Sequence, residues 1–303
     1  MTAQIITDPP RPGTPEWRGM ITASKVPVIL GLSPWQSPYR LAAEMMGLVE
    51  PEEITPQKQK LFDWGHAAEE GIAAFWKRQH PEWEVSDGEV AYTEPSLPFP
   101  NLVTVDRIAT HRETGEQRVL EMKTVNSFDQ LAKWLKPGEP HSVPANYEAQ
   151  HLFQKGVSGI HEGEVLVQAM GAPESHNVTW NALTFARILK RCNEFYSLLQ
   201  EGTLPDLDDT TSTYETVRGL HPDIERDTVH VATTEEALAL FDAKEAADQS
   251  EAKYRKLRTQ LLDNMGNRHR AVAGDTVFAR RQAGRGKTPE FRLVNKARKE
   301  LGD

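Results

Sequence analysis

Cysteine is almost absent from this sequence, since Cys192 is the only one among 303 residues. A single cysteine excludes an intrachain disulfide, a cysteine-based zinc site and a cysteine-bound iron–sulfur cluster. Long apolar runs are also missing, because none approaches the ~20 residues that a membrane span needs. The first residues, MTAQIITDPPRPGTPEW, lack the basic and apolar segments of a signal peptide. We therefore expect a cytoplasmic protein without membrane association.

Net positive charge is lacking too, because 44 acidic residues outnumber 35 basic ones and give a formal net charge of −9. Taken alone, this balance argues against non-specific attraction to a polyanion. However, residues 268–299 hold ten Lys or Arg against two acids, whereas residues 201–265 hold fifteen acids against seven bases. A concentrated basic surface fits nucleic acid that enters one specific place. Arg280 and Arg281 in this basic tail either contact DNA backbone or belong to a solvated surface.

Capping residues and apolar spacing predict several helices. Ser37 as cap, Pro38 at the first helical position and Gly47 as stop bound the clearest one. The helices are expected at 37–47, at 56–79, from about 144 to 159, over FARILKRCNEFYSLLQEG (185–202), and at 233–266. Residues 83–124 and the segments GEVLVQAM and HNVTWNAL have the composition of strands.

The order of these elements predicts an α/β (α+β) fold, with a central mixed β-sheet flanked by helices and an α-rich C-terminal extension. Four divisions of the chain are expected. They are a flexible lead-in over 1–16, the main domain over 17–202, a linker-like segment over 203–232, and a long helix plus a basic extension over 233–303. A small hairpin and a short helix are expected in the last of these.

The stretch RVLEMKTVN, residues 118–126, places two opposite charges in an otherwise apolar strand. Glu121 and Lys123 are two residues apart and therefore project to the same face. A hairpin through residues 111–117 would bring Asp106 on the neighbouring strand within a residue or two of Glu121. Two close carboxylates favour a hard cation such as Mg²⁺ or Mn²⁺, and a lysine beside it can orient a water for attack on a phosphodiester. The alternative is a simple ion pair on a half-exposed strand.

Four motifs together extend this pattern. Asp106 followed by Glu121-Met122-Lys123 resembles the PD-(D/E)XK nuclease core, with valine in place of its proline. The segments ITASKVPVILGLSPWQSPYRL (21–41), GHAAEE (65–70) and YEAQHLFQKGVSG (147–159) resemble motifs of the YqaJ-type viral recombinases, the family of the phage lambda exonuclease. The four occur in the family order over a little more than half of the chain.

The resemblance implies a metal-dependent exonuclease that degrades the 5′-ended strand of linear double-stranded DNA and leaves a 3′ single strand for annealing-type recombination. Asp106 and Glu121 would bind Mg²⁺ (or Mn²⁺), with Glu69 as a further acidic ligand. Lys123 would position the attacking water, and Gln150 would support the metal site or the substrate. The implied partners are duplex DNA ends, a single-strand-annealing protein and, in a trimeric ring, further copies of the chain.

The same resemblance assigns Ser24 to the terminal 5′-phosphate. The arginine that usually lies seven residues before this serine is replaced by Trp17, and Arg18 follows it as the candidate. Ser24 also fits a helix N-cap, Glu69 a solvated helix face, and Gln150 a capping or solvent-facing residue. Two other functions stay open: a restriction-type endonuclease of the same superfamily, and a non-catalytic protein that binds DNA ends.

Overall fold

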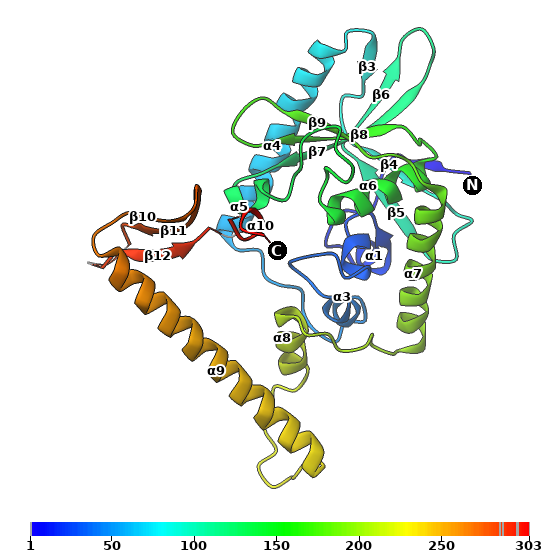
Figure 1. The fold of residues 1–303 in the computed structure, drawn as a ribbon. Helices are drawn as coiled ribbons and strands as arrows, with labels where there is room; N and C mark the ends of the chain where they lie inside the picture. The colour runs from blue at the N-terminus through cyan, green and yellow to red at the C-terminus, as the bar shows by residue number, and fades with distance from the viewer. Residues whose placement is uncertain (1, 285, 287, 295–296, 303) are drawn as a thin grey trace. The chain divides into compact units, whose positions relative to one another are not determined.

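The computed structural model describes residues 2–284, 286, 288–294 and 297–302. The chain forms two compact units, Met1–Ile224 and Glu225–Asp303, which Figure 1 colours from blue to yellow-green and from yellow to red. The first unit combines mixed β-sheets with flanking helices, so the predicted fold class is confirmed.

The larger sheet of the first unit has the strand order β3-β6-β7-β8-β9. Its central strands β7 and β8 are parallel, whereas the other neighbours are antiparallel, as expected for a mixed sheet. The bounds are β3 (Trp83–Val85), β6 (Arg107–His111), β7 (Gln117–Thr124), β8 (Gly163–Gln168) and β9 (Glu174–Asn177). The long strand β7 carries the Glu-x-Lys sequence across the middle of this sheet.

A second sheet has the order β1-β4-β5-β2, in which β2 and β5 are parallel. Its strands are β1 (Gln4–Ile6), β2 (Ile21–Thr22), β4 (Val90–Thr93) and β5 (Asn101–Val105). β1 lies in the segment predicted as a lead-in and pairs with β4. The chain passes from this sheet to the larger one at Asp106, between β5 and β6.

Helices cover the sheets with two separate apolar clusters. One cluster joins α4 to the larger sheet through Ile72, Trp76, Leu120 and Leu166. The larger cluster lies among α2, α6, α7 and the strands around β5, and it includes the fully buried Phe153. The helices of the first unit are α1 (Pro15–Gly19), α2 (Val26–Ile29), α3 (Pro38–Met45), α4 (Pro56–Gln79), α5 (Phe128–Leu131), α6 (Ala145–Ser158), α7 (Ala182–Glu201) and α8 (Thr211–Leu220).

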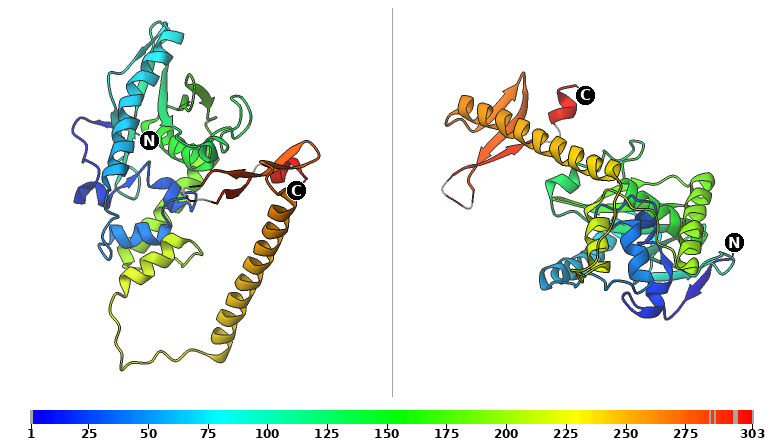
Figure 2. Two further views of the ribbon diagram at one scale, coloured as in Figure 1. Left: turned by 90° about the vertical axis from the view of Figure 1, so that its left-hand side faces the viewer. Right: turned by 90° about the horizontal axis from the view of Figure 1, so that it is seen from below.

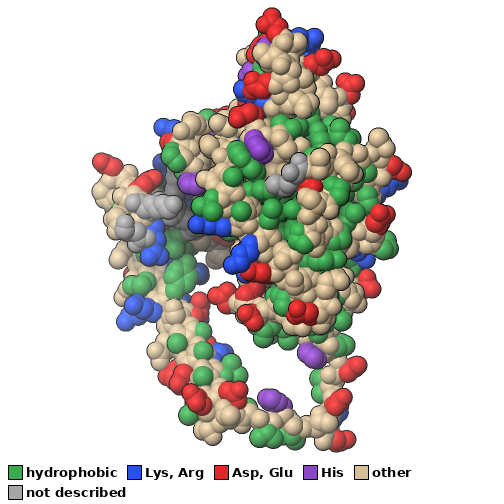
Figure 3. Space-filling view, turned by 90° about the vertical axis from the view of Figure 1, so that its right-hand side faces the viewer, with side chains coloured by type: hydrophobic (Ala, Val, Ile, Leu, Met, Phe, Trp, Pro, Cys, Tyr) green, Lys and Arg blue, Asp and Glu red, His purple; other side chains and the backbone are tan. Residues whose placement is uncertain are grey.

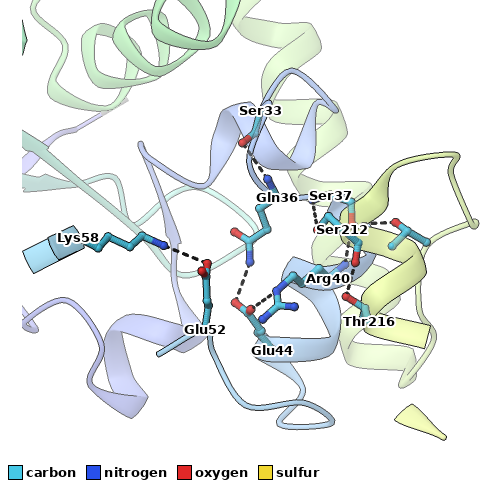
Figure 4. Close-up of polar contacts among 10 residues, drawn as sticks. Ser33, Gln36, Ser37, Arg40, Glu44, Glu52, Lys58, Ser212 and Thr216 are labelled. Carbon is cyan, nitrogen blue, oxygen red and sulfur yellow. Dashed lines mark hydrogen bonds and ion pairs between the residues drawn. The ribbon is translucent and has the colours of Figure 1, made fainter. Parts of the chain in front are cut away.

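The segment predicted as a linker includes α8, which packs on α3. Figure 4 shows Ser212 on α8 accepting a hydrogen bond from the backbone of Ser37 at 3.0 Å. Thr213 is buried and donates to the Ser37 hydroxyl at 2.8 Å. On the same helix α3, Arg40 pairs with Glu44 at 2.8 Å. The boundary at 202 therefore stays a prediction, with α8 inside the first compact unit.

The second unit begins with one long helix, α9 (Thr234–Met265), which Figure 2 shows as a straight rod in both views. It starts with a capping box, because Thr233 accepts from the backbone of Glu236 while the Glu236 side chain accepts from that of Thr233. A three-stranded antiparallel sheet and a short helix follow. They are β10 (Arg270–Ala273), β11 (Thr276–Gln282), β12 (Glu290–Leu293) and α10 (Ala297–Glu300). The tail thus has one strand more than the predicted hairpin.

Acidic side chains are dispersed among apolar and neutral ones on the face shown in Figure 3. Within the described residues, no helix combines the length and the apolar character that a membrane span requires.

Candidate active site

Asp106 occupies the point at which the chain leaves one sheet and enters the other. Arg107 pairs with Leu120 on β7, so the residue before it stands opposite Glu121, as the hairpin predicted. The Asp106 carboxylate accepts a 2.6 Å hydrogen bond from the backbone of Met122. Burial and the neighbouring charge of Glu121 raise the pKa of Asp106 well above its ordinary value. This carboxylate therefore lies where a nearby cation would stabilise its charged form.

Glu121 is fully enclosed, with an exposed fraction of 1%. Its Oε1 accepts hydrogen bonds from Lys123 and, at 2.7 Å, from Gln150 on α6. Its Oε2 accepts from Gln154, one helical turn further along α6, at 2.6 Å. A buried carboxylate needs such donors, because its desolvation is otherwise costly. The α6 amides thus fix the position of this side chain in the sheet.

Lys123 is a cation at the edge of this arrangement. Burial lowers its pKa, but the charges of Glu121 and Asp106 outweigh that effect and raise it above the ordinary lysine value. Its ammonium also lies 5.5 Å from the ring centre of Tyr147, within cation–π range. The ion pair with Glu121, which the sequence left as an alternative, is therefore present, and it lies beside Asp106 rather than alone.

Three carboxylates converge next to this ion pair. One oxygen from each of Glu69, Glu89 and Asp106 lies within 4.8 Å of the others. Burial raises the pKa of Glu69; His66 opposes this, and Glu89 adds to it. Hard oxygen donors at this mutual distance suit Mg²⁺ or Mn²⁺, and a divalent cation would offset their repulsion. The residues present therefore fit a metal ion.

Sequence reasoning missed Glu89 and Gln154. Glu89 precedes β4, whose pairing of Val90 with Val105 brings it beside Asp106. No local sequence pattern predicts the pairing of these two strands. Gln154 had a usable signal, because it lies four residues after Gln150 and therefore on the same helix face.

Ser24 and Arg18 lie outside the carboxylate group. Ser24 is exposed and its hydroxyl shares a 3.0 Å hydrogen bond with Thr22. It does not cap α2, because Lys25 holds the N-cap position. The buried Lys25 ammonium donates to three backbone carbonyls, including that of Arg18 at 2.8 Å. Lys25 thereby holds the end of α1 close to Ser24, and burial lowers its pKa to about 7.

Arg280 and Arg281 belong to β11 in the second unit. As adjacent residues of a strand, they project to opposite faces of its sheet. Arg280 is exposed, whereas Arg281 is half-buried and pairs with Phe291.

The fold and site define a class: a mixed α/β protein in which Asp106 stands opposite a Glu-x-Lys strand, with further carboxylates beside it. Residues 16–161 match the family model of the YqaJ-like viral recombinase domain. The chain therefore carries a YqaJ-like viral recombinase domain, and the family suggested by the four motifs is confirmed.

Among solved structures, the chain is similar to an alkaline exonuclease, LHK-Exo, from Laribacter hongkongensis. The identity is 18% and the TM-score 0.48, over 62% of this chain and 94% of that one. LHK-Exo in complex with dAMP gives the same identity and TM-score, with 91% of that chain covered. The structure named SSO0001 is 12% identical, with a TM-score of 0.38, over 70% of this chain and 88% of that one. No curated protein matches the sequence.

Proposed function

We propose that this protein is a metal-dependent exonuclease that degrades the 5′-ended strand of linear double-stranded DNA and leaves a 3′ single strand for annealing-type recombination. The observation that carries the proposal is the convergence of Asp106, Glu69 and Glu89 beside the Glu121–Lys123 pair. This convergence occurs within a recombinase domain. A group of carboxylates with an adjacent lysine is suited to displacement at a phosphodiester.

Asp106, Glu121 and Glu69 would hold the ion, and Glu89 lies close enough to Asp106 and Glu69 to join them. Mg²⁺ is the proposed ion, and Mn²⁺ shares its preference for oxygen donors. When bound, such an ion polarises the phosphodiester and lowers the pKa of a water molecule.

The chain's own residues orient the reactants. Gln150 and Gln154 fix the Glu121 carboxylate, which in turn holds the Lys123 ammonium beside Asp106. In this proposal the Lys123 ammonium, which Glu121 holds in place, donates to the attacking water. Ser24 and Arg18 would contact the terminal 5′-phosphate and set the polarity of digestion.

The proposed substrates are duplex DNA ends in the cytoplasm of a host cell. The 3′ single strand would pass to a single-strand-annealing protein. Several copies of the chain in a ring, a trimer by resemblance, would keep the enzyme on one DNA end.

The test is digestion of linear duplex DNA with a 5′-phosphate or a 5′-hydroxyl, with Mg²⁺ or with a chelator, beside a closed circle. We expect loss of linear DNA from its 5′ ends in Mg²⁺ only, faster with the phosphate. Lys123→Ala should lower the rate at least about 100-fold, as expected for loss of a group that acts on the attacking water.

Lys136→Ala is the matched control, since that lysine is exposed and its side chain forms no hydrogen bond or ion pair among the described residues. Cutting of the closed circle would favour a restriction-type endonuclease. Binding of DNA ends without cutting in Mg²⁺ would favour a non-catalytic protein.

A further inference from the structure

The small sheet of the second unit places three arginines on one rung. Arg280 on the central strand β11 is the direct partner of Arg270 on β10 and of Arg292 on β12. Directly opposed residues of antiparallel strands project to the same face. Arg270, Arg280 and Arg292, called the arginine row below, therefore lie side by side across the whole width of the sheet.

The arginine row lies on the solvent side of this sheet. All three arginines are exposed. The alternate residues Ala271 and Ala279 point the other way and are buried against Met265 at the end of α9. The sheet thus has one face whose alanines pack against the end of α9 and one face whose centre is cationic.

Like charges directly opposite each other destabilise a sheet. Only Arg292 has a carboxylate partner, the exposed Glu290 at 3.3 Å, and in the described part of the chain neither Arg270 nor Arg280 forms an ion pair. Charged residues on edge strands prevent a sheet from pairing with other chains, which accounts for Arg270 on β10 and Arg292 on β12. This edge protection does not account for Arg280, which is on the central strand with a neighbour on each side.

We propose that the arginine row binds the phosphate backbone of duplex DNA. Guanidinium groups match phosphate oxygens through paired hydrogen bonds. Successive opposed residues are about 5 Å apart, so the row spans about 10 Å, which corresponds to the axial rise of about three nucleotides of one strand at 3.4 Å each. The polyanion removes the mutual repulsion of the three arginines. This surface rests on the proposed function for its substrate, and it explains how a protein of net charge −9 holds DNA.

The experiment measures the affinity of the full-length protein for a short labelled duplex, in a chelator that prevents digestion, over a series of salt concentrations. Each phosphate contact contributes about 0.9 to the slope of log K against log salt. Replacing all three residues (R270Q/R280Q/R292Q) should lower the slope by about 2.7. R280Q alone should lower it by about 0.9, and R280K, which keeps the charge, should retain most of it.

The matched control is K253Q/K256Q/R258Q, which removes the same charge from exposed positions of α9 in the same unit. Its slope should equal that of the unchanged protein. Because repulsion across the row is relieved, R280Q should melt at the same temperature or higher, so a loss of binding will not reflect unfolding.

Equal slopes for the row variant and the control variant would overturn the proposal. An effect on single-stranded DNA alone would overturn the assignment to duplex. The digestion assay separates this surface from the proposed function. If the protein digests DNA but the row variant and the control variant have equal salt slopes, only the proposed DNA-binding surface is refuted. If binding depends on the arginine row but no digestion occurs, only the proposed exonuclease activity is refuted.

Discussion

Glu121 illustrates how a buried charge becomes a fixed part of a site. Three donors from two elements surround it: Lys123 on its own strand, and Gln150 and Gln154 on α6. Gln154 also donates to the carbonyl of Thr104 at 2.9 Å, so one amide links the strand before Asp106 to the strand of Glu121. The geometry of the candidate site therefore depends on Gln154, a fully buried residue.

Replacing Gln154 with leucine should separate positioning from chemistry. Leucine has a similar volume but cannot donate, which leaves Glu121 Oε2 and the Thr104 carbonyl without this partner. We expect a loss of about 1–3 kcal/mol in the free energy of unfolding. Metal-dependent digestion should fall about 10- to 100-fold, as for other residues that orient ligands. Urea denaturation and single-turnover digestion measure the two effects.

Gln200→Leu provides the control for that experiment, because Gln200 is exposed on α7. If Gln154→Leu digests DNA at the unchanged rate, the amide has no part in positioning Glu121.

His151 makes stability depend on pH. It is completely buried, its Nδ1 donates to Gln154 at 3.2 Å, and its Nε2 has no partner among the described residues. Burial, with the charge of Lys155 adding to it, lowers the pKa of His151 to about 3. Between the ordinary value of about 6.5 and this value, only the unfolded chain binds the proton. Stability therefore falls as the pH falls through this range.

At pH 5, protonation of His151 in the unfolded chain lowers the free energy of unfolding by about 2 kcal/mol relative to pH 7. Unfolding by urea at both values, for the unchanged protein and for His151→Gln, isolates it, because every other titrating group is common to the two proteins. The variant should lose about 2 kcal/mol less between pH 7 and pH 5. Equal losses would show that His151 does not titrate in this way.

At the scale of elements, local signals were sufficient where an element depends on its own residues. Ser37 caps α3 by accepting from Arg40, and Pro38 is its first residue, as predicted. The helix expected over 56–79 is α4. What could not be predicted is non-local: the segment NLVTVDRIATH suggests one strand, yet it divides at Asp106 between two sheets. The pairing of β4 with β5, which brings Glu89 to the site, is of the same kind.

The packing of α6 against α7 requires a glycine at position 156, which the sequence pattern alone does not predict. A Cβ atom on Gly156 would lie 2.1 Å from Cε2 of Phe185, closer than any real contact. Gly156→Ala should therefore displace the buried Phe185 ring and lower the free energy of unfolding by about 1–3 kcal/mol. Phe185→Leu in the same chain should recover part of that loss. Thermal or urea denaturation measures both.

Gly71→Ala is the control, and it should change the free energy of unfolding in the opposite direction. Gly71 lies within α4, and nothing is within 4 Å of its Cβ position. Gly71→Ala should raise stability by about 0.5–1 kcal/mol, because alanine is the better helix former. If Gly156→Ala also stabilises the protein, the close packing of α6 on α7 is not a constraint.

At the scale of the whole molecule, the candidate carboxylate site and the arginine row belong to different compact units. The first unit contains every residue of the site together with both of its larger apolar clusters. The second unit has a small core around Met265, Ala271 and Ala279. This division separates the proposed chemistry from a proposed means of holding DNA, and the two can be removed independently.

A chain that ends at residue 224 should fold and keep the proposed metal-dependent digestion at low salt. It should bind DNA more weakly, with a shallower dependence on salt than the full-length protein, because it lacks the arginine row. A chain that ends at residue 202 also lacks α8 and leaves Ser37 without its two α8 partners. At about 1 kcal/mol for each hydrogen bond, we expect it to melt about 4–8 °C lower.

Thermal unfolding and salt-dependent binding of the three chains test both boundaries. Equal melting temperatures for the chains ending at 202 and 224 would support the predicted boundary at 202 and contradict a structural role for α8. An unchanged salt dependence after removal of residues 225–303 would show that the first unit alone holds the DNA.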